Sequence, residues 1–134
     1  MSRLALDTSA YSALRRNHPG LLGAMSEADE VYMSPIVLGE LHAGFLRGGR
    51  RHENEAGLRE FLEEPRVSIA PVGAETALRY AEIVSYLRGT GQSIPSNDAW
   101  IAALAMELGL RLLTTDAHFQ RLPQISVDYY GSAL

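Results

Sequence analysis

The sequence predicts a three-layer α/β domain in which a central, mainly parallel sheet is flanked by helices on both faces. Short apolar runs alternate along the chain with longer segments whose apolar residues recur at helical spacing. Such an alternation of strands and helices is typical of a parallel sheet that is covered on both sides. No linker, internal repeat or low-complexity tract interrupts the pattern, so residues 1–134 are expected to form a single domain.

The chain is expected to open with a strand and two helices. Residues 3–6 are an apolar run that ends at Asp7, as expected for a short buried strand. Asp7 and the two hydroxyl residues after it are strong N-cap types, so a helix is expected to continue through Leu14. A His-Pro-Gly sequence at residues 18–20 breaks this helix, and a second helix is expected over residues 21–28.

A strand and two further helices come next. Residues 31–33 form a compact apolar strand. Ser34 is a good N-cap and is followed by proline at the first helical position, which predicts a helix from residue 35 to about residue 47. Two glycines end that helix. A charged helix over residues 51–63 follows, and Pro65 ends it.

The third unit is a strand followed by two helices. Residues 67–72 predict the strand, and helical periodicity over residues 75–88 predicts an amphipathic helix. Ser96 is expected to cap another helix, which ends at Gly109. The residues expected to be buried are Leu78, Ala81, Val84 and Leu87 in the first helix, and Trp100, Ile101, Leu104 and Leu108 in the second.

Three short elements are expected to close the chain. They are a strand at residues 111–115, a brief helical turn at residues 119–122 and a final strand at residues 125–129. Functional sites in open parallel sheets form beyond the carboxyl ends of the strands. The residues that follow each strand are therefore the first place to look for function.

The composition is that of a globular domain in water, and it excludes several kinds of chemistry. Hydrophobic residues make up 46% of the chain and charged residues 21%, and no apolar run approaches the ~18 residues of a membrane span. The absence of cysteine and lysine removes disulfides, thiolate nucleophiles, Schiff-base lysines and P-loops. The absence of cysteine makes a cytoplasmic location the default expectation, and the stretch before the first acidic residue is too short for a secretory signal. The net charge of −4 argues against broad, nonspecific binding of nucleic acid, but not against a nuclease with a concentrated acidic site.

Four acidic residues stand where a carboxylate contributes little to folding. Asp7 and Asp116 end two predicted strands, Glu40 borders the apolar face of a helix, and Asp98 lies in the first turn of another helix. Each has an ordinary alternative as a cap, turn or solvated helix residue. Together they predict one acidic pocket, in which each pair ~4 Å apart repels by about 4 kcal/mol at an effective dielectric constant near 20. Such a pocket raises its pKa values or holds cations, and the second option indicates Mg²⁺ or Mn²⁺.

Small polar residues and arginines accompany these acids. The small residues could hold carboxylates or metal-bound water, although the same types also serve as helix caps. A cluster of arginines around Gly48 and Gly49 fits either a contact with an RNA backbone or an exposed helix end. The four histidines show no metal-ligand spacing. The small polar residues are Thr8, Ser9, Asn97 and Thr115, and the arginines are Arg47, Arg50 and Arg51.

The segments around the four acids resemble the four signature regions of a PIN domain. They read LDTSAY at residues 6–11, SPIVLGEL at residues 34–41, NDAWIAA at residues 97–103 and LTTDAHF at residues 113–119. Their order and spacing are those of the family, and the similarity covers essentially the whole chain. The compact length is most similar to the toxins of VapBC toxin–antitoxin pairs. His118 stands where some relatives carry a fifth acidic ligand, which leaves the number of metal ions open.

The resemblance implies a PIN-like fold and a metal-dependent endoribonuclease that hydrolyses RNA phosphodiester bonds with Mg²⁺ or Mn²⁺, as the toxin of a type II toxin–antitoxin system. Asp7, Asp98 and Asp116 would be direct metal ligands, and Glu40 would bind a second ion or position the attacking water. A homodimer is also implied, with a cognate VapB-type antitoxin whose C-terminal segment covers the pocket. Two alternatives stay open: a noncatalytic PIN module that binds RNA or protein, and a Mg²⁺-dependent phosphatase of the haloacid-dehalogenase type. The phosphatase class expects an acid where this chain has Ser9.

Overall fold

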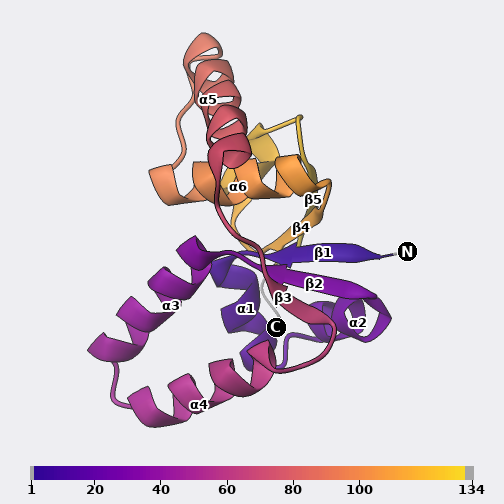
Figure 1. The fold of residues 1–134 in the computed structure, drawn as a ribbon, viewed down its shortest axis with the longest axis vertical. Coiled ribbons are helices and arrows are strands. Elements are labelled where there is room, and N and C mark those ends of the chain that lie inside the picture. The colour runs from indigo at the N-terminus through magenta and orange to yellow at the C-terminus, as the bar shows by residue number, and fades with distance from the viewer. Residues whose placement is uncertain (1, 132–134) are drawn as a thin grey trace.

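The computed structural model describes residues 2–131 and places a five-stranded sheet between two layers of helices (Figure 1). Every pair of neighbouring strands is parallel, and the strand order is β3-β2-β1-β4-β5. The predicted three-layer α/β fold with a parallel sheet is therefore confirmed. The elements, in chain order, are β1 (Arg3–Leu6), α1 (Thr8–Arg15), α2 (Pro19–Glu27), β2 (Glu30–Met33), α3 (Pro35–Arg47), α4 (Arg51–Leu62), β3 (Val67–Ile69), α5 (Ala74–Gly89), α6 (Ser96–Leu108), β4 (Arg111–Thr114), the 3₁₀ turn η1 (Ala117–Arg121) and β5 (Ser126–Tyr129).

The central strand β1 contributes Leu4 and Leu6, which share one of its faces, to the hydrophobic core, and Ala5 on its other face is partly buried against the core. Leu4 and Leu6 of this strand are at most 1% exposed. Helices α1, α2 and α4 lie on one side of the sheet, and α5 and α6 lie on the other (Figure 1). The described part of the chain contains no helix that is long and apolar enough to cross a membrane.

The direction of chain winding reverses between β1 and β4. From β1 the chain proceeds to β2 and β3 on one side of the sheet, and it returns through α5 and α6 to β4 and β5 on the other. A crevice forms beyond the carboxyl ends of two strands where such a reversal occurs. The fold therefore provides one preferred place for a site, between the ends of β1 and β4.

The predicted helix ends are right in part. The Ser34 hydroxyl accepts a hydrogen bond of 3.1 Å from the backbone N–H of Val37, and Gly109 ends α6 with a φ of 65°. Ser96, however, does not cap α6. The N-cap position belongs to Pro95, whose ψ of 145° is extended, and Ser96 is already the first helical residue. No side chain caps this helix.

Helix α2 begins two residues earlier than predicted. The ring nitrogen Nδ1 of His18 accepts a hydrogen bond of 3.1 Å from the backbone N–H of Gly20, so His18 is the N-cap and Pro19 the first helical residue. Strand β3 ends earlier than predicted, at Ile69. Its only partner strand, β2, ends at Met33, so the ladder has no neighbour to extend along.

The predicted buried face of α5 is wrong in part. Leu78 is 60% exposed and Ala81 is exposed too, whereas Thr76 and Ile83 are fully buried. This rotation matches a contact with α6, because the Thr76 hydroxyl donates a hydrogen bond of 2.5 Å to the Glu107 carboxylate. The α6 prediction fares better: Ile101 and Leu104 are buried, while Trp100 is half-buried and stacks on Tyr80 of α5 with ring centroids 4.1 Å apart.

Candidate active site

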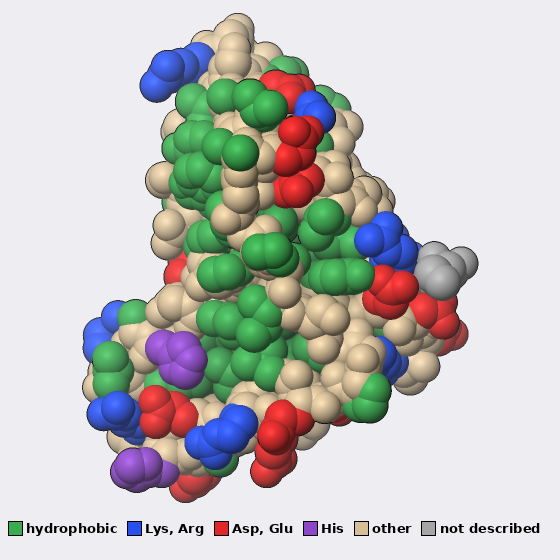
Figure 2. Space-filling view, viewed as in Figure 1, with side chains coloured by type: hydrophobic (Ala, Val, Ile, Leu, Met, Phe, Trp, Pro, Cys, Tyr) green, Lys and Arg blue, Asp and Glu red, His purple; other side chains and the backbone are tan. Residues whose placement is uncertain are grey.

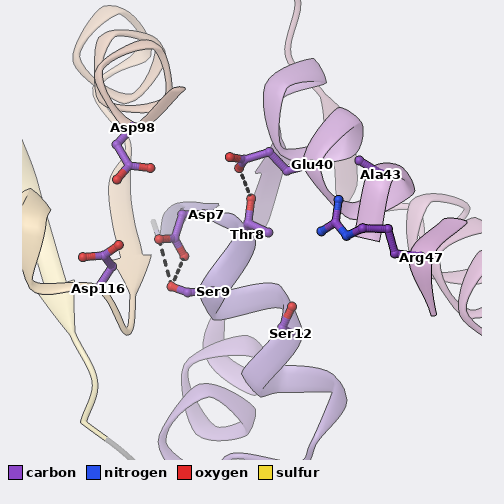
Figure 3. A pocket seen from close by; sticks show the side chains of 9 residues that line it. All are labelled: Asp7, Thr8, Ser9, Ser12, Glu40, Ala43, Arg47, Asp98 and Asp116. Atoms are coloured by element: carbon purple, nitrogen blue, oxygen red, sulfur yellow. Dashed lines mark hydrogen bonds between the residues drawn. The ribbon is translucent and has the colours of Figure 1, made fainter. Parts of the chain in front are cut away.

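The four predicted acids meet at the crevice between β1 and β4. Asp7 directly follows β1, and its backbone N–H donates to the carbonyl of Leu113 in β4. Asp116 lies two residues beyond the end of β4. Asp98 enters from the first turn of α6 and Glu40 from the middle of α3. Figure 3 shows the carboxylates of Asp7, Asp98 and Asp116 facing one space, with Glu40 beside Thr8 at its margin.

Asp7 is the most buried of these acids, at 3% exposed. It is the N-cap of α1 and accepts a hydrogen bond of 2.7 Å from the backbone N–H of Ala10. The hydroxyls of Ser9 and Thr114 also donate to its carboxylate, at 2.8 Å and 2.5 Å. Burial raises the pKa of Asp7, these donors oppose the rise, and the negative charge of Asp116 adds to it.

Glu40 is held by two helices other than its own. The hydroxyl of Thr8 in α1 donates to one carboxylate oxygen, and the side-chain amide of Asn97 in α6 donates to the other at 3.1 Å. These contacts fix a carboxylate that the helix alone would leave in solvent. Glu40 therefore has a defined position at the margin of the acidic space.

Asp98 and Asp116 share a histidine. The Nδ1 atom of His118 lies 3.3 Å from Asp98 Oδ2 and 3.1 Å from Asp116 Oδ1. One candidate ligand atom from each of these three residues lies within 4.8 Å of the other two. Burial raises the pKa of Asp98, contact with His118 opposes the rise, and the charges of Asp116 and Asp7 add to it.

These side chains line a hollow of about 520 Å³ that opens to solvent. Arg47 reaches it from the end of α3, two turns after Glu40, and is the only arginine among its lining residues (Figure 3). The other two arginines predicted to cluster with Arg47 pair instead with acids of α4, Arg50 with Glu53 and Arg51 with Glu55. The lining consists of Asp7, Thr8, Ser9, Ser12, Glu40, Ala43, Arg47, Asp98 and Asp116.

Three of the four predicted supporting residues contact the acids through their side chains, namely Thr8, Ser9 and Asn97. The side chain of Thr115 makes no hydrogen bond within the described residues, and only its backbone N–H contacts the site, at the Ser9 hydroxyl. The supporting role was predicted for Thr115, one residue beyond the threonine that contacts Asp7, Thr114. The contact of His118 with two of the acids was not predicted, although the spacing Asp-x-His in a turn was an available signal.

The arrangement suits binding of a divalent cation. A space faced by three aspartates attracts cations, and carboxylate oxygens are the ligands that Mg²⁺ and Mn²⁺ accept. The residue two positions after Asp7, where a haloacid-dehalogenase phosphatase would carry a second acid, is Ser9, whose hydroxyl donates to Asp7. The loop after β1 therefore lacks the second acid that a phosphatase of the haloacid-dehalogenase type requires, whereas the three aspartates still fit a metal-assisted hydrolase of another class.

Comparison with known proteins identifies the family. The PIN domain family profile matches residues 4–125. A Ribonuclease VapC of Rickettsia bellii is 34% identical over 128 residues, which is 92% of this chain and 93% of the relative. Two solved structures are each 26% identical: VapBC-1 of nontypeable Haemophilus influenzae, with a TM-score of 0.83 and coverage of 95% of this chain and 97% of that one, and VapBC2 of Rickettsia felis bound to a promoter DNA fragment, with a TM-score of 0.82 and coverage of 95% and 98%. The chain therefore belongs to the PIN-domain family and, within it, groups with the VapC ribonucleases.

Proposed function

We propose that this chain is a metal-dependent endoribonuclease that hydrolyses RNA phosphodiester bonds and acts as the toxin of a type II toxin–antitoxin pair. The observation that carries the proposal is the meeting of Asp7, Asp98 and Asp116 at the reversal point of a PIN-domain sheet. Relatives that match over nearly their whole length are named ribonucleases, which supports the same reaction.

The residues fit a divalent ion. Asp7, Asp98 and Asp116 would be its direct ligands, and His118 would add one nitrogen. Imidazole is accepted more readily by Mn²⁺ than by Mg²⁺, which requires near-ideal oxygen coordination, so we assign Mn²⁺ as the preferred ion. When bound, such an ion supplies a Lewis acid for the phosphate oxygens and lowers the pKa of a coordinating water.

The remaining residues of the hollow would position the reactants. Glu40, fixed by Thr8 and Asn97, is placed to orient the attacking water and to accept its proton. Arg47 is placed to bind a nonbridging phosphate oxygen next to the acids. The backbone N–H and hydroxyl groups around Asp7 keep that carboxylate in one orientation.

The partner proposed for this chain is a VapB-type antitoxin. The likeness to VapBC-1 and to DNA-bound VapBC2 supports such a pairing. Its C-terminal segment would cover the hollow, and an arginine or lysine in that segment would occupy the space between the carboxylates. We also propose a homodimer that acts in the cytoplasm. Exposed apolar side chains at Ile69, Val72 and Leu78 support a further protein contact, and Figure 2 shows hydrophobic side chains spread over this view of the molecule.

Cleavage assays test the proposal directly. Wild type, Asp7→Asn and Asp98→Asn are incubated with RNA and either Mg²⁺ or Mn²⁺, with EDTA as the control. We expect cleavage by wild type only in the presence of the ion, with 5′-phosphate and 3′-hydroxyl ends. Equal cleavage by the two variants would show the site assignment to be wrong. Calorimetry that detects no binding of either ion to wild type would favour a noncatalytic module instead.

A further inference from the structure

A second hollow adjoins the acidic one on the side of α1. It has a volume of about 200 Å³ and lies between α1, α3 and α4. Ser12 lines both hollows, so they are continuous along the surface of α1. The lining of the second hollow consists of Tyr11, Ser12, Arg15, Arg16, Leu41, Phe45 and Asn54.

The side chains of the arginines in the two hollows have no hydrogen-bond or ion-pair partner among the described residues. Seven of the twelve arginines bind carboxylates or backbone carbonyls: Arg3, Arg50, Arg51, Arg66, Arg79, Arg111 and Arg121. The side chains of the other five make no hydrogen bond or ion pair with any residue from 2 to 131. Three of those five, Arg15, Arg16 and Arg47, line the two connected hollows. Guanidinium groups without a carboxylate partner are suited to binding phosphate oxygens, often through two donors at once.

The guanidinium of Arg15 lies against a glycine of α4. Gly57 is buried, and a Cβ atom at this position would lie 2.4 Å from Nη2 and 3.0 Å from Cζ of Arg15. The guanidinium therefore rests directly on the backbone of α4, where any other residue would push it away. The absence of a side chain at Gly57 thus leaves the space that the guanidinium of the exposed Arg15 occupies.

The opposite wall of this hollow is apolar and includes an aromatic ring. Phe45 and Leu41 of α3 provide it, and the Phe45 ring makes an edge-to-face contact with His42 at a centroid distance of 5.8 Å. Aromatic faces accept nucleobases of any identity. Seven residues separate Thr8, beside the acids, from Arg15, which corresponds to about 10 Å along the helix. That distance is within reach of the nucleotides that neighbour a phosphate held at the acids.

We propose that the second hollow is a subsite for a nucleotide of the RNA substrate that lies beside the scissile bond. Arg15 and Arg16 bind its backbone phosphate, its base packs against Phe45 and Leu41, and Asn54 is placed for hydrogen bonds to the base edge. This inference rests on the proposed ribonuclease function and deepens it, because it assigns a path along α1 to the RNA strand. Unpaired positive charge, continuous with the acidic hollow, favours a nucleic acid as the occupant over a peptide.

The test measures RNA binding separately from cleavage. All variants are made in an Asp98→Asn background, and fluorescence anisotropy follows binding of a labelled single-stranded oligoribonucleotide in Mg²⁺. Arg15→Gln removes the charge, and Gly57→Ala displaces the guanidinium while keeping its charge. Arg88→Gln is the matched control, since Arg88 is equally unpaired but lies on α5, outside both hollows. Circular dichroism and melting curves verify that each variant is folded.

We expect Arg15→Gln to weaken binding about tenfold and Gly57→Ala to weaken it in the same direction, with Arg88→Gln unchanged. The slope of log affinity against log salt should become less negative by about 0.7 for each phosphate contact that is lost. Unchanged affinity and slope in both Arg15→Gln and Gly57→Ala would overturn the proposal. Unchanged RNA binding together with weakened binding of the antitoxin would assign the hollow to a protein and overturn it too.

The outcome also separates the subsite from the proposed reaction. If wild type cleaves no RNA with either ion, while Arg15→Gln still weakens RNA binding in the Asp98→Asn background, the proposed reaction fails and the subsite stands. If that protein cleaves RNA and neither variant changes the affinity, the reaction stands and the subsite fails. Absence of RNA binding in the Asp98→Asn background, together with absence of cleavage by wild type, overturns both.

Discussion

Replacing Thr114 by valine tests whether the Thr114 hydroxyl, at the end of β4, stabilises the ionised carboxylate of Asp7. Valine keeps the shape of the side chain but removes a hydroxyl that donates to Asp7 and accepts from the backbone N–H of Asp116 at 2.9 Å. Thr114 is fully buried, so water does not replace the lost group. A hydrogen bond to a charged group contributes about 1.5–3 kcal/mol, and an unpaired buried donor costs a similar amount, so we expect the free energy of unfolding to fall by roughly 2–4 kcal/mol.

The same substitution is expected to change the pH dependence of metal binding. Burial raises the pKa of Asp7, and the Thr114 hydroxyl works against that rise. Without the hydroxyl, the ionised carboxylate loses a donor and its pKa rises further. Because only the ionised form binds a metal ion, the pH at which Mn²⁺ affinity is lost on acidification should move upward.

Two measurements and one control decide the matter. Urea denaturation in EDTA gives the free energy of unfolding, and calorimetric titration with Mn²⁺ at a series of mildly acidic pH values gives the affinity curve. Thr115→Val is the control, because the Thr115 side chain makes no hydrogen bond within residues 2–131, and its effect should stay within about 0.5 kcal/mol. Equal stability of Thr114→Val and wild type, with superimposed pH curves, would refute the reasoning.

Four further predictions address other parts of the molecule. His118→Gln should weaken Mn²⁺ binding more than Mg²⁺ binding and remove the nitrogen coupling in the electron spin echo of bound Mn²⁺; retention of that coupling would exclude His118 as a ligand. Arg47→Ala should raise KM for RNA about tenfold with little change in kcat, as expected for a contact made equally in the ground and transition states, and a fall confined to kcat would contradict this role. Because the folded-state pKa of Asp98 is raised, the contribution of protonated Asp98 to the free energy of unfolding is fully present below its unfolded-state pKa and is lost as the pH rises through its folded-state pKa. In EDTA, the melting temperature of wild type should therefore fall over that pH window, and the melting temperature of Asp98→Asn should fall less. Thr76→Val should lower the free energy of unfolding by roughly 1–3 kcal/mol, because it leaves the Glu107 carboxylate without its donor, and urea denaturation measures the difference.

The position of the acidic hollow was predictable from the sequence because strand ends fix it. Once β1 and β4 are recognised as parallel strands, the residues that follow them, Asp7 and Asp116, must emerge at the same edge of the sheet. Asp98 and Glu40 were harder, since nothing local says where a helix will dock. They were grouped with the strand-end acids because all four stand where a carboxylate contributes little to folding, the resemblance to a PIN domain added support, and the structure places both of them in the lining of the same hollow.

The misses concern orientation, which a single sequence does not determine. Successive residues of a strand point to opposite faces, so whether Thr114 or Thr115 meets Asp7 depends on the register that pairs Leu6 with Leu113. The rotation of α5 is likewise a tertiary property. Leu78 fits a helical stripe as well as Ile83 does, and packing against α6 decides which of them is buried.

The charges of the two hollows imply different requirements for binding RNA. At the acids, three aspartates face one space, and a phosphate brought there is repelled until a cation lies between. At Arg15 and Arg16 no carboxylate lines the hollow, so the proposed phosphate contact there needs no divalent ion. RNA association should therefore have one component that requires the divalent ion and another that does not. An inhibitor that carries its own cation into the acidic hollow would block the first component and leave the second available for a weakly held strand.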